Sequence, residues 1–237
     1  MLSKTLLTAE CLLIGLMLLG MLGQRFQILP FKVAFGSFAL ALVLAAIVAL
    51  VALVVVGLSF GPISTDARPS AAIAFALGLV PLLLTAMIAG AGFKAPKIHN
   101  ITTDLDNPVV FVNAQKLRGA DANSLSPPSG KAAELHRSHY AHLAPIQVDM
   151  APSAAYERAL DVAQQLGWEV SYRDPKTLQF EALERTALFG FVDDVAVRIS
   201  AVEAGSQVDL RSVSRVGVSD LGANAKRIER FREAFKR

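Results

Sequence analysis

The sequence predicts an α+β protein in which three N-terminal transmembrane helices precede a soluble domain with an antiparallel sheet. Three observations lead to this fold class. Long apolar runs fill the first 97 residues, two amphipathic helical patterns occur after residue 150, and four stretches between those patterns alternate apolar and polar side chains. The expected order of the soluble elements is β-α-β-β-β-β-α. An antiparallel sheet with helices on one face satisfies this order.

The membrane region covers residues 1–97. A helix that crosses a bilayer needs about 20 apolar residues, and three runs are long enough, at about 6–23, 36–58 and 71–92. A cleaved signal peptide is the alternative for the first run, but no clear small-x-small cleavage motif follows it. We therefore expect three retained helices, with Ala72-x-x-x-Ala76 and Ala86-x-x-x-Gly90 suited to close packing.

Glu10 is the only acid within a predicted span. An intramembrane carboxylate is by default a candidate functional site. The alternative is that Glu10 lies within about one turn of the water interface and snorkels toward it, and this is what we expect. A single carboxylate with no basic partner in the spans does not indicate a transport pathway.

Charge is distributed unevenly along the chain. Residues 1–97 contain six of the 23 Lys and Arg and two of the 20 acids, so residues 98–237 hold 17 basic and 18 acidic residues. The soluble part is almost neutral, which argues against a nucleic-acid partner because such a domain needs a basic face. The single cysteine excludes an internal disulfide or a cysteine-based zinc site.

The basic flanks indicate only weakly on which side of the membrane the soluble domain lies. Three spans put Lys4 and Arg68 on one side, and they put four basic residues on the other: Arg25, Lys32, Lys94 and Lys97. The positive-inside rule then favours a cytoplasmic soluble domain by four to two, or by four to three when the α-amino group is counted.

The soluble domain is expected at residues 144–237, joined to the spans by an irregular linking or wrapping segment at 98–143. A short strand is predicted in Pro145–Met150, and a helix begins at Pro152 and ends at Gly167. The last helix carries its apolar residues on one side: Leu221, Ala225, Ile228, Phe231 and Phe235. The strands between the two helices are predicted at 168–173, 177–183, 195–202 and 208–216.

Period-two alternation assigns the strand side chains to two faces. The face toward the helices receives Trp168, Val170, Tyr172, Leu178, Phe180, Val195, Val197, Ile199, Val208 and Leu210. The opposite face receives Glu169, Arg173, Glu181, Arg198, Asp209, Arg211 and Arg215. Mixed charge is typical of a solvated antiparallel face, and the alternative is a docking face for an anionic headgroup or a partner protein. The candidate binding residues are Arg198, Arg211 and Arg215 on this face and Arg227 on the last helix.

Polar residues near the last helix have expected structural roles. Ser219 or Asp220 is placed to cap the helix. Asn224 and Arg227 lie three positions apart on the helix and are placed to reach back to the sheet.

Three acids are the candidate catalytic residues: Asp193, Asp194 and Asp220. The first two could serve acid–base chemistry or a divalent ion. Adjacent residues entering a strand point to opposite faces, however, so this pair does not converge by itself. We prefer a turn in which a carboxylate accepts backbone N–H bonds.

Three histidines, His136, His139 and His142, follow a three-residue spacing that could place two imidazoles on one helix face for a metal ion. Successive steps of three drift around a 3.6-residue helix, and no acid or cysteine is adjacent. No metal site is therefore predicted.

Four polar residues follow the third span and are the candidate membrane-proximal residues: His99, Thr102, Thr103 and Asp104. They could cap turns or form a small site, and we expect capping. No nucleophile elbow, phosphate loop or nucleotide fingerprint is present in the sequence, so no cofactor is predicted.

Four stretches carry a resemblance to a known family: HNITTDLDNP, GWEVSYRDP, FGFVDDVAVRI and RSVSRVGVSDLGANAKRI. Together they resemble a bacterial domain-of-unknown-function family, number fourteen ninety-nine, over about residues 98–237. Three helices before such a domain are typical of the family, which has no established reaction. Its membrane-anchored or exported members imply that the domain lies outside the inner membrane, and we follow this implication over the charge count.

We therefore expect a non-catalytic protein of the bacterial inner membrane with a periplasmic soluble domain. The domain would bind a partner protein or lipid, as an accessory or assembly subunit of a membrane complex. The expected partners are the lipid bilayer and another membrane protein, and no nucleic acid. The alternatives are a membrane-bound hydrolase of an envelope component, which would use one of the three candidate acids with an arginine, and a lipid-binding module.

Overall fold

The computed structural model describes residues 1–61, 65–90 and 92–237. The chain divides into a membrane unit, which contains residues 1–90 and the hairpin tip 187–190, and a soluble unit, which contains residues 92–186 and 191–237. Residues 62–64, in the predicted connection between the second and third spans, and residue 91, near the end of the predicted third span, lie outside the described residues.

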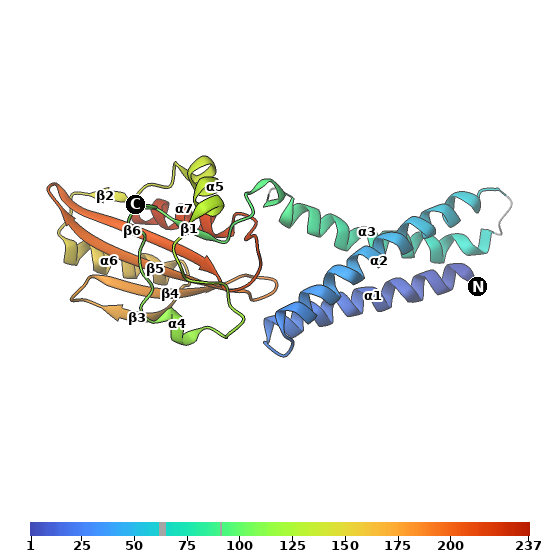
Figure 1. Cartoon of the computed structure of the whole chain (residues 1–237). Coiled ribbons are helices and arrows are strands. Elements are labelled where there is room, and N and C mark those ends of the chain that lie inside the picture. Colours follow the sequence, from blue (N-terminus) through green and yellow to red (C-terminus); the bar gives the residue numbers. More distant parts are fainter. Residues whose placement is uncertain (62–64, 91) are drawn as a thin grey trace. The chain divides into compact units, whose positions relative to one another are not determined.

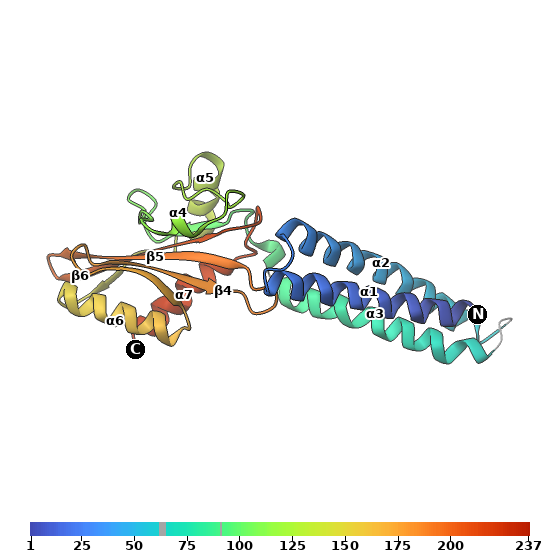
Figure 2. The same ribbon diagram turned by 90° about the horizontal axis from the view of Figure 1, so that it is seen from below.

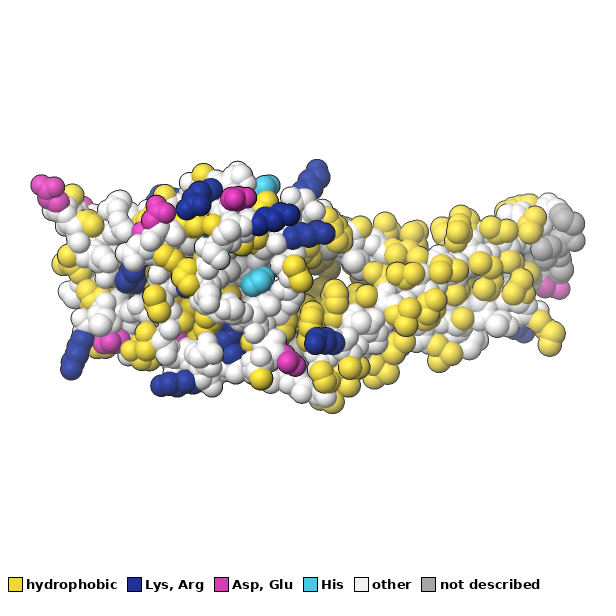
Figure 3. Space-filling model, in the orientation of Figure 1, with side chains coloured by type: hydrophobic (Ala, Val, Ile, Leu, Met, Phe, Trp, Pro, Cys, Tyr) yellow, Lys and Arg dark blue, Asp and Glu magenta, His cyan; other side chains and the backbone are white. Residues whose placement is uncertain are grey.

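Three long helices form the membrane unit: α1 (Leu2–Arg25), α2 (Phe31–Leu58) and α3 (Arg68–Ala89), the last preceded by a 3-10 turn at Thr65–Ala67. All three are long and apolar enough to cross a membrane. Hydrophobic side chains crowd their surface, whereas charged side chains are spread over the soluble unit (Figure 3). The prediction of three N-terminal apolar helices is confirmed, and the protein is a membrane protein.

Small residues let the three helices approach each other. The side of α2 that is buried carries Ala34, Ala41, Ala45, Ala49 and Ala52. On α3 the buried positions are Ala71, Ala74 and Gly78, whereas Ala72 and Ala76 are exposed. The contact between the helices is therefore made by Ala71, Ala74 and Gly78, which neighbour the predicted Ala72-x-x-x-Ala76 pair. The predicted pair leaves its side chains on the outer surface of the helices.

Glu10 does not snorkel. Its side chain is fully buried and lies against Gly78 of α3, which is also close to Ala49 of α2. A Cβ atom at position 78 would lie only 2.5 Å from the Glu10 Oε1 atom, so the glycine provides the space that the carboxyl group occupies. Neither carboxyl oxygen has a hydrogen-bond partner in the described part of the chain.

The soluble unit is built on an antiparallel sheet. Its strands are β1 (Asn100–Thr102), β2 (Ile146–Val148), β3 (Glu169–Asp174), β4 (Gln179–Arg185), β5 (Val192–Val202) and β6 (Gly205–Ser214). The strand order is β1-β6-β5-β4-β3, and β2 also pairs with β6 (Figure 1). The short strands β1 and β2 share the outer edge of β6, since β1 pairs with residues 211–213 and β2 pairs with residues 206–208.

Helices lie on both sides of this sheet. The helices of the soluble unit are α4 (Ala114–Leu117), α5 (Gly130–Tyr140), α6 (Pro152–Gln165) and α7 (Ala223–Phe235), with a 3-10 turn at Gly92–Lys94. The two amphipathic helices α6 and α7 cover one face, and α4 lies over the other (Figure 2). The predicted order β-α-β-β-β-β-α is confirmed from β2 to α7. The predicted irregular segment 98–143 additionally contains β1, α4 and α5.

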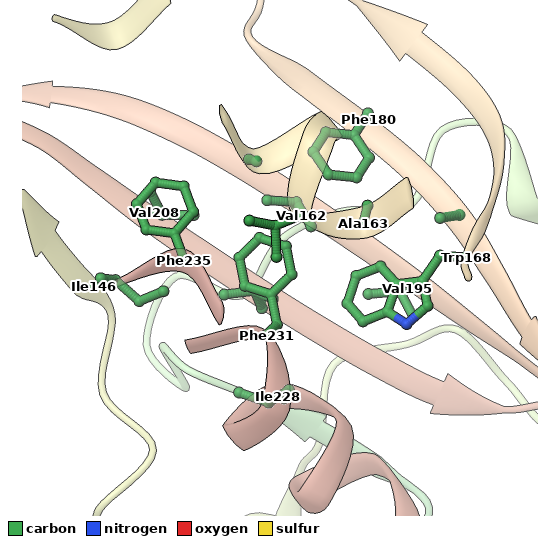
Figure 4. Close-up of a cluster of buried hydrophobic side chains, with 14 of the residues drawn as sticks. Ile146, Val162, Ala163, Trp168, Phe180, Val195, Val208, Ile228, Phe231 and Phe235 are labelled. Carbon is green, nitrogen blue, oxygen red and sulfur yellow. The ribbon is translucent and has the colours of Figure 1, made fainter. Parts of the chain in front are cut away.

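The hydrophobic core lies between the sheet and helices α6 and α7 (Figure 4). Trp168, Phe231 and Phe235 stack in a row, with centroid distances of 5.4 Å and 5.8 Å between successive rings. Strand residues predicted to face the helices are buried beside them: Phe180, Val195, Val197, Ile199, Val208 and Leu210. Alternation therefore predicted this face correctly for β4, β5 and β6.

The face assignment is wrong at the end of β3. A register shift between Val170 and Tyr172 pairs Tyr172 with Glu181 and Arg173 with Phe180. Paired residues share a face of the sheet. Tyr172 therefore moves away from the helices, and Arg173 moves toward them. An extra residue in one strand exchanges the faces of all residues that follow it, and the alternation in the sequence does not reveal the bulge.

Leu221 also departs from its predicted place on the last helix. The α7 helix begins at Ala223, whereas Leu221 is in the left-handed region with φ +52° and is 39% exposed. The following Gly222 has φ +81°. These two residues form a turn that separates the strand exit from the helix.

His136 of α5 holds the edge strand β1. The backbone N–H of Thr102 donates a hydrogen bond of 3.1 Å to the His136 Nε2 atom, which must therefore be unprotonated. The imidazole is only 4% exposed, and this burial lowers the pKa of His136. The histidine is thus a structural group that favours its neutral form.

This arrangement predicts a loss of stability on acidification. Because the pKa of His136 is lower in the folded protein than in the unfolded chain, its contribution is complete above the unfolded value of about 6.5 and declines as the pH falls below it. Unfolding by urea can be followed at pH 7.5 and pH 5.5 through Trp168, the single tryptophan, which lies in the soluble core. We expect His136→Gln to reduce the pH dependence, since a glutamine oxygen can accept the Thr102 hydrogen bond without titrating.

The matched control is His139→Gln. His139 is exposed and lies against the Leu135 carbonyl and the Ser138 hydroxyl of its own helix. The control should keep the pH dependence of the parent protein. An equal reduction in both variants would contradict the role assigned to His136.

Candidate functional site

The charged face of the sheet is covered by the chain itself. We call residues 103–126, which contain α4, the wrapping segment. The predicted solvated face is wrong, because Glu181, Asp209 and Arg211 are each at most 1% exposed. Alternation placed these side chains on the correct face, but their charges pair with groups of the wrapping segment and the sheet instead of with water.

Arg211 is the centre of this face. Its Nε donates to the Asn100 side-chain oxygen at 3.1 Å, and its Nη1 donates to the Val109 carbonyl at 3.0 Å. Its Nη2 donates to the carbonyls of Leu125 and Ser126 at 2.6 Å and 2.8 Å. All of these acceptors are neutral. Burial, followed by the charge of a neighbouring arginine, lowers the Arg211 pKa to about 10, so the group remains cationic at neutral pH.

Glu181 on β4 binds backbone N–H groups of the same segment, whereas Arg211 binds its carbonyl groups. Its carboxylate accepts the backbone N–H groups of Val112, Asn113 and Ala114, with the last at 2.6 Å. These N–H groups open the short helix α4, and N–H groups at a helix start lack partners within the helix. A carboxylate is therefore a suitable acceptor, and Glu181 fixes the start of α4 on the sheet.

Two further arginines of this face hold both an acid and the wrapping segment. Arg215 binds both carboxylate oxygens of Asp194, at 3.0 Å and 2.8 Å, and donates to the Leu117 carbonyl at 2.9 Å. Arg198 donates to Asp209 at 3.2 Å and to the carbonyl of Asn107 at 2.9 Å.

A second charged network lies on the helix side of the sheet. The Arg227 guanidinium donates from Nη2 to Asp193 at 2.6 Å, from Nη1 to the Ser212 hydroxyl at 2.9 Å, and from Nε to Glu184. Asn224 joins it through its side-chain oxygen, which accepts from Ser212 at 2.6 Å. Asn224 and Arg227 thus reach back to the sheet, as their spacing predicts.

The pKa values follow from this network. Burial lowers the pKa of Arg227, but Asp193 and Glu184 outweigh burial and raise it. For Glu184, burial raises the pKa, but Arg227 and Arg230 outweigh burial and lower it. Glu184 and Arg227 are therefore held in their charged forms.

The three candidate catalytic acids do not converge. Asp193 faces α7 and Asp194 faces the wrapping segment, so the two carboxylates lie on opposite faces of β5, as adjacent strand residues should. The preferred interpretation of a turn is wrong, because both residues lie inside β5 and bind arginines. Asp220 accepts the N–H groups of Gly222 and Asn224 at 2.8 Å and 3.0 Å, which is the capping role expected for it. Burial raises the pKa of Asp220, and the charge of Asp193 on the same side of the sheet adds to this effect.

The membrane-proximal candidates have local partners. Asp104 accepts the N–H groups of residues 106 and 107, both at 2.9 Å, which is a capped turn. Thr103 exchanges hydrogen bonds with the backbone of Leu210, and the Thr102 hydroxyl donates to the Asp104 carbonyl. The His99 Nδ1 atom lies 3.3 Å from the Val218 carbonyl oxygen. These contacts tie the start of the wrapping segment to β6.

The three spaced histidines have separate surroundings. His136 is bound to β1, His139 lies on the surface of its own helix, and the His142 Nε2 atom lies 3.0 Å from the Glu229 carboxylate of α7. Within the described ranges, no group of three or more His, Cys, Asp or Glu residues is placed to hold a metal ion.

A shallow hollow of about 430 Å³ lies between the end of β4 and α7. Its lining includes Glu184 and Arg227, which belong to the network above, and Arg230, which donates to Glu184 at 2.8 Å. Sequence reasoning missed Glu184 and also Arg118, whose Nε lies 3.5 Å from Asp194. Both are ordinary charged residues in the sequence, and only the strand pairing and the path of the wrapping segment bring them to their partners.

The Arg211 contacts can be tested by substitution. Arg211→Lys keeps the charge but cannot reach the separated acceptors that a planar guanidinium binds. Each buried acceptor left unsatisfied costs about 1–3 kcal/mol, so we expect the free energy of unfolding to fall by about 2 kcal/mol or more. Urea unfolding monitored by Trp168 fluorescence measures this change, and proteolysis of the native protein should show faster cleavage within residues 103–126.

Arg173→Lys is the matched control, because Arg173 is an exposed arginine of the same sheet. It should change the free energy of unfolding by no more than about 0.5 kcal/mol. Equal losses in the two variants, or unchanged proteolysis of the wrapping segment in Arg211→Lys, would contradict the anchoring role of Arg211.

Comparison with known proteins assigns this domain to a family. The family model described as "Protein of unknown function (DUF1499)" matches residues 100–235. The match covers more than half of the chain and nearly the whole soluble unit, including the wrapping segment and both charged networks. A search of the curated proteins found no match. The resemblance predicted from the sequence is confirmed, and the chain belongs to the family of proteins of unknown function DUF1499.

Proposed function

We propose that this membrane protein is a non-catalytic protein of the bacterial inner membrane whose soluble domain lies in the periplasm and binds a partner protein. It would act as an accessory or assembly subunit of a membrane complex. The observation that carries this proposal is the use of the charged residues. The acids and arginines from which an active site could be built bind one another and the backbone of the chain's own wrapping segment and last helix.

The consequence of this anchoring is a rigidly presented outer surface. Val109 is fully buried, with its carbonyl bound to Arg211, and the N–H of Val112 is bound to Glu181. The side chains of Val110 and Val112, on this anchored stretch, point outward and are 65% and 52% exposed. Binding residues are commonly found on loops that a rigid scaffold positions, and an apolar pair on such a loop suits contact with a protein.

The hydrolase alternative requires the candidate acids to share a pocket with an arginine. Asp193 and Asp194 lie on opposite faces of β5, and Asp220 caps α7. The lipid-binding alternative requires an apolar groove between the sheet and the helices, where the stacked rings of Trp168 and Phe231 lie. Both observations support the partner-protein proposal over these alternatives.

The partner-binding surface is tested by Val110→Asp combined with Val112→Asp. In mild detergent, the parent protein should co-purify with other subunits at fixed stoichiometry. The double variant should lose most of this association, because charged side chains would have to be desolvated at the interface. Subunit stoichiometry from quantitative mass spectrometry of the purified material is the measurement.

Val202→Asp is the matched control, since Val202 is an exposed valine at the end of β5 with 37% exposure. It should retain the association. Recovery of the parent protein as a lone monomer would contradict the proposal. Unchanged association of the double variant would exclude this surface, provided that Trp168 fluorescence shows that both variants are folded.

The periplasmic location has its own test. A reporter that is active only outside the cytoplasm, fused after Arg237, should be active, and the matching cytoplasmic reporter should be silent. The opposite result would follow the count of basic flanks and overturn both the location and the hydrolase alternative acting on the envelope.

A further inference from the structure

A cluster of exposed apolar residues lies where the soluble unit begins. Phe93, in the 3-10 turn Gly92–Lys94, is 69% exposed, and Val218 and Leu221, in the turn before α7, are 75% and 39% exposed. We call these three residues the apolar cluster. They come from two parts of the chain that are far apart in the sequence, so their exposure together is a property of the fold.

Contacts within the soluble unit hold these two parts of the chain together. A Cβ atom at Gly92 would lie 2.6 Å from the Leu221 carbonyl oxygen and 2.7 Å from its Cβ atom, so Leu221 packs directly on the glycine. The N–H of Asp220 donates to the Ile98 carbonyl at 3.2 Å. The turn that carries Val218 and Leu221 is therefore fixed to the segment that carries Phe93.

Leu221 is presented outward by an unfavourable backbone. A residue with a side chain seldom adopts a positive φ, and Leu221 has φ +52°. The turn is held by Asp220, which accepts two N–H groups, and by the Ser219 hydroxyl, which accepts the Leu221 N–H at 3.3 Å. The fold thus maintains an exposed leucine at a position where a polar residue or glycine would be less costly.

The covalent chain limits the distance between Phe93 and the end of α3. Phe93 follows Ala89, the last residue of α3, by four positions. Each residue spans at most about 3.6 Å, so Phe93 lies within about 14 Å of the end of α3 in any orientation of the two units. The polar region on each side of the hydrocarbon core is several ångström thick. An exposed phenylalanine at this position is within reach of the lipid headgroups.

Basic residues accompany the apolar cluster. Lys94, directly after Phe93, and Lys97, three positions further on, are both exposed. Neither forms an ion pair with an acid in the described part of the chain. Asp220, the acid of the turn before α7, faces inward to cap the helix. Exposed apolar residues beside lysines are the composition by which a protein surface binds the interface of an anionic membrane.

We propose that Phe93, Val218 and Leu221 form a membrane-docking surface, which inserts among the headgroups of the bilayer while Lys94 and Lys97 bind anionic phospholipids. The surface would fix the soluble domain against the membrane and determine which of its sides a partner can reach. It does not rest on the proposed function, because docking to lipid requires no partner protein.

The test uses the full chain, reconstituted into nanodiscs without any other protein. An environment-sensitive dye is attached at Val218→Cys in a Cys11→Ser background, which removes the single native cysteine. Nanodiscs of brominated phosphatidylcholine should quench this dye several-fold more than the same dye at Val202→Cys. Replacing a quarter of the lipid by an anionic phospholipid should increase the quenching at position 218 further.

Two variants separate the contributions. In Phe93→Ser combined with Leu221→Ser, quenching at position 218 should fall toward the value at position 202. In Lys94→Gln combined with Lys97→Gln, the increase caused by anionic lipid should disappear while part of the basal quenching remains. Equal quenching at positions 218 and 202 would overturn the proposal. Such a result would indicate that the surface does not contact lipid, and it would leave the test of Val110 and Val112 unaffected.

Discussion

The burial of the Arg211 guanidinium among backbone carbonyls is the interaction on which the soluble domain depends. A buried cation is tolerated only when its donors are satisfied, and here the acceptors come from β1, from Val109 within the wrapping segment and from the end of that segment. The sheet alone does not supply them. Arg211 can therefore be buried only when β1 and the wrapping segment are in place. The folding of the sheet and the ordering of the wrapping segment thus depend on each other.

The same face of the sheet binds the wrapping segment through its backbone carbonyl and N–H groups. Arginines bind its carbonyl groups at Asn107, Val109 and Leu117, whereas Glu181 binds the N–H groups at the start of α4. Contacts of this kind place few demands on the side chains of the segment. The outward positions can thus carry residues suited to a partner without weakening the anchoring.

The sequence predicted the spans, the element order and the sheet faces because these follow from local periodicity. It predicted a linking or wrapping segment at 98–143 but not that this segment covers the charged face, since charged residues alternate in the same way whether water or a chain segment lies above them. The bulge in β3 and the left-handed turn at Leu221 were missed because each depends on one residue. Glu184 and Arg118 were missed because their partners are distant in sequence.

The anchoring is uneven along the wrapping segment. The backbone near Val109 and Val112 is held by Arg211 and Glu181, whose charged groups are hydrogen-bonded. Arg118, in contrast, has guanidinium donors without acceptors among the described residues. Its side chain is 3% exposed, its Nε lies 3.5 Å from Asp194, and its Nη1 has no acceptor in the described part of the chain. Burial lowers its pKa, and the neighbouring Arg215 adds to this effect while Asp194 opposes it. Unsatisfied buried donors reduce local stability, so opening of the segment is expected to begin after α4, while the part that carries the exposed valines remains fixed on the sheet.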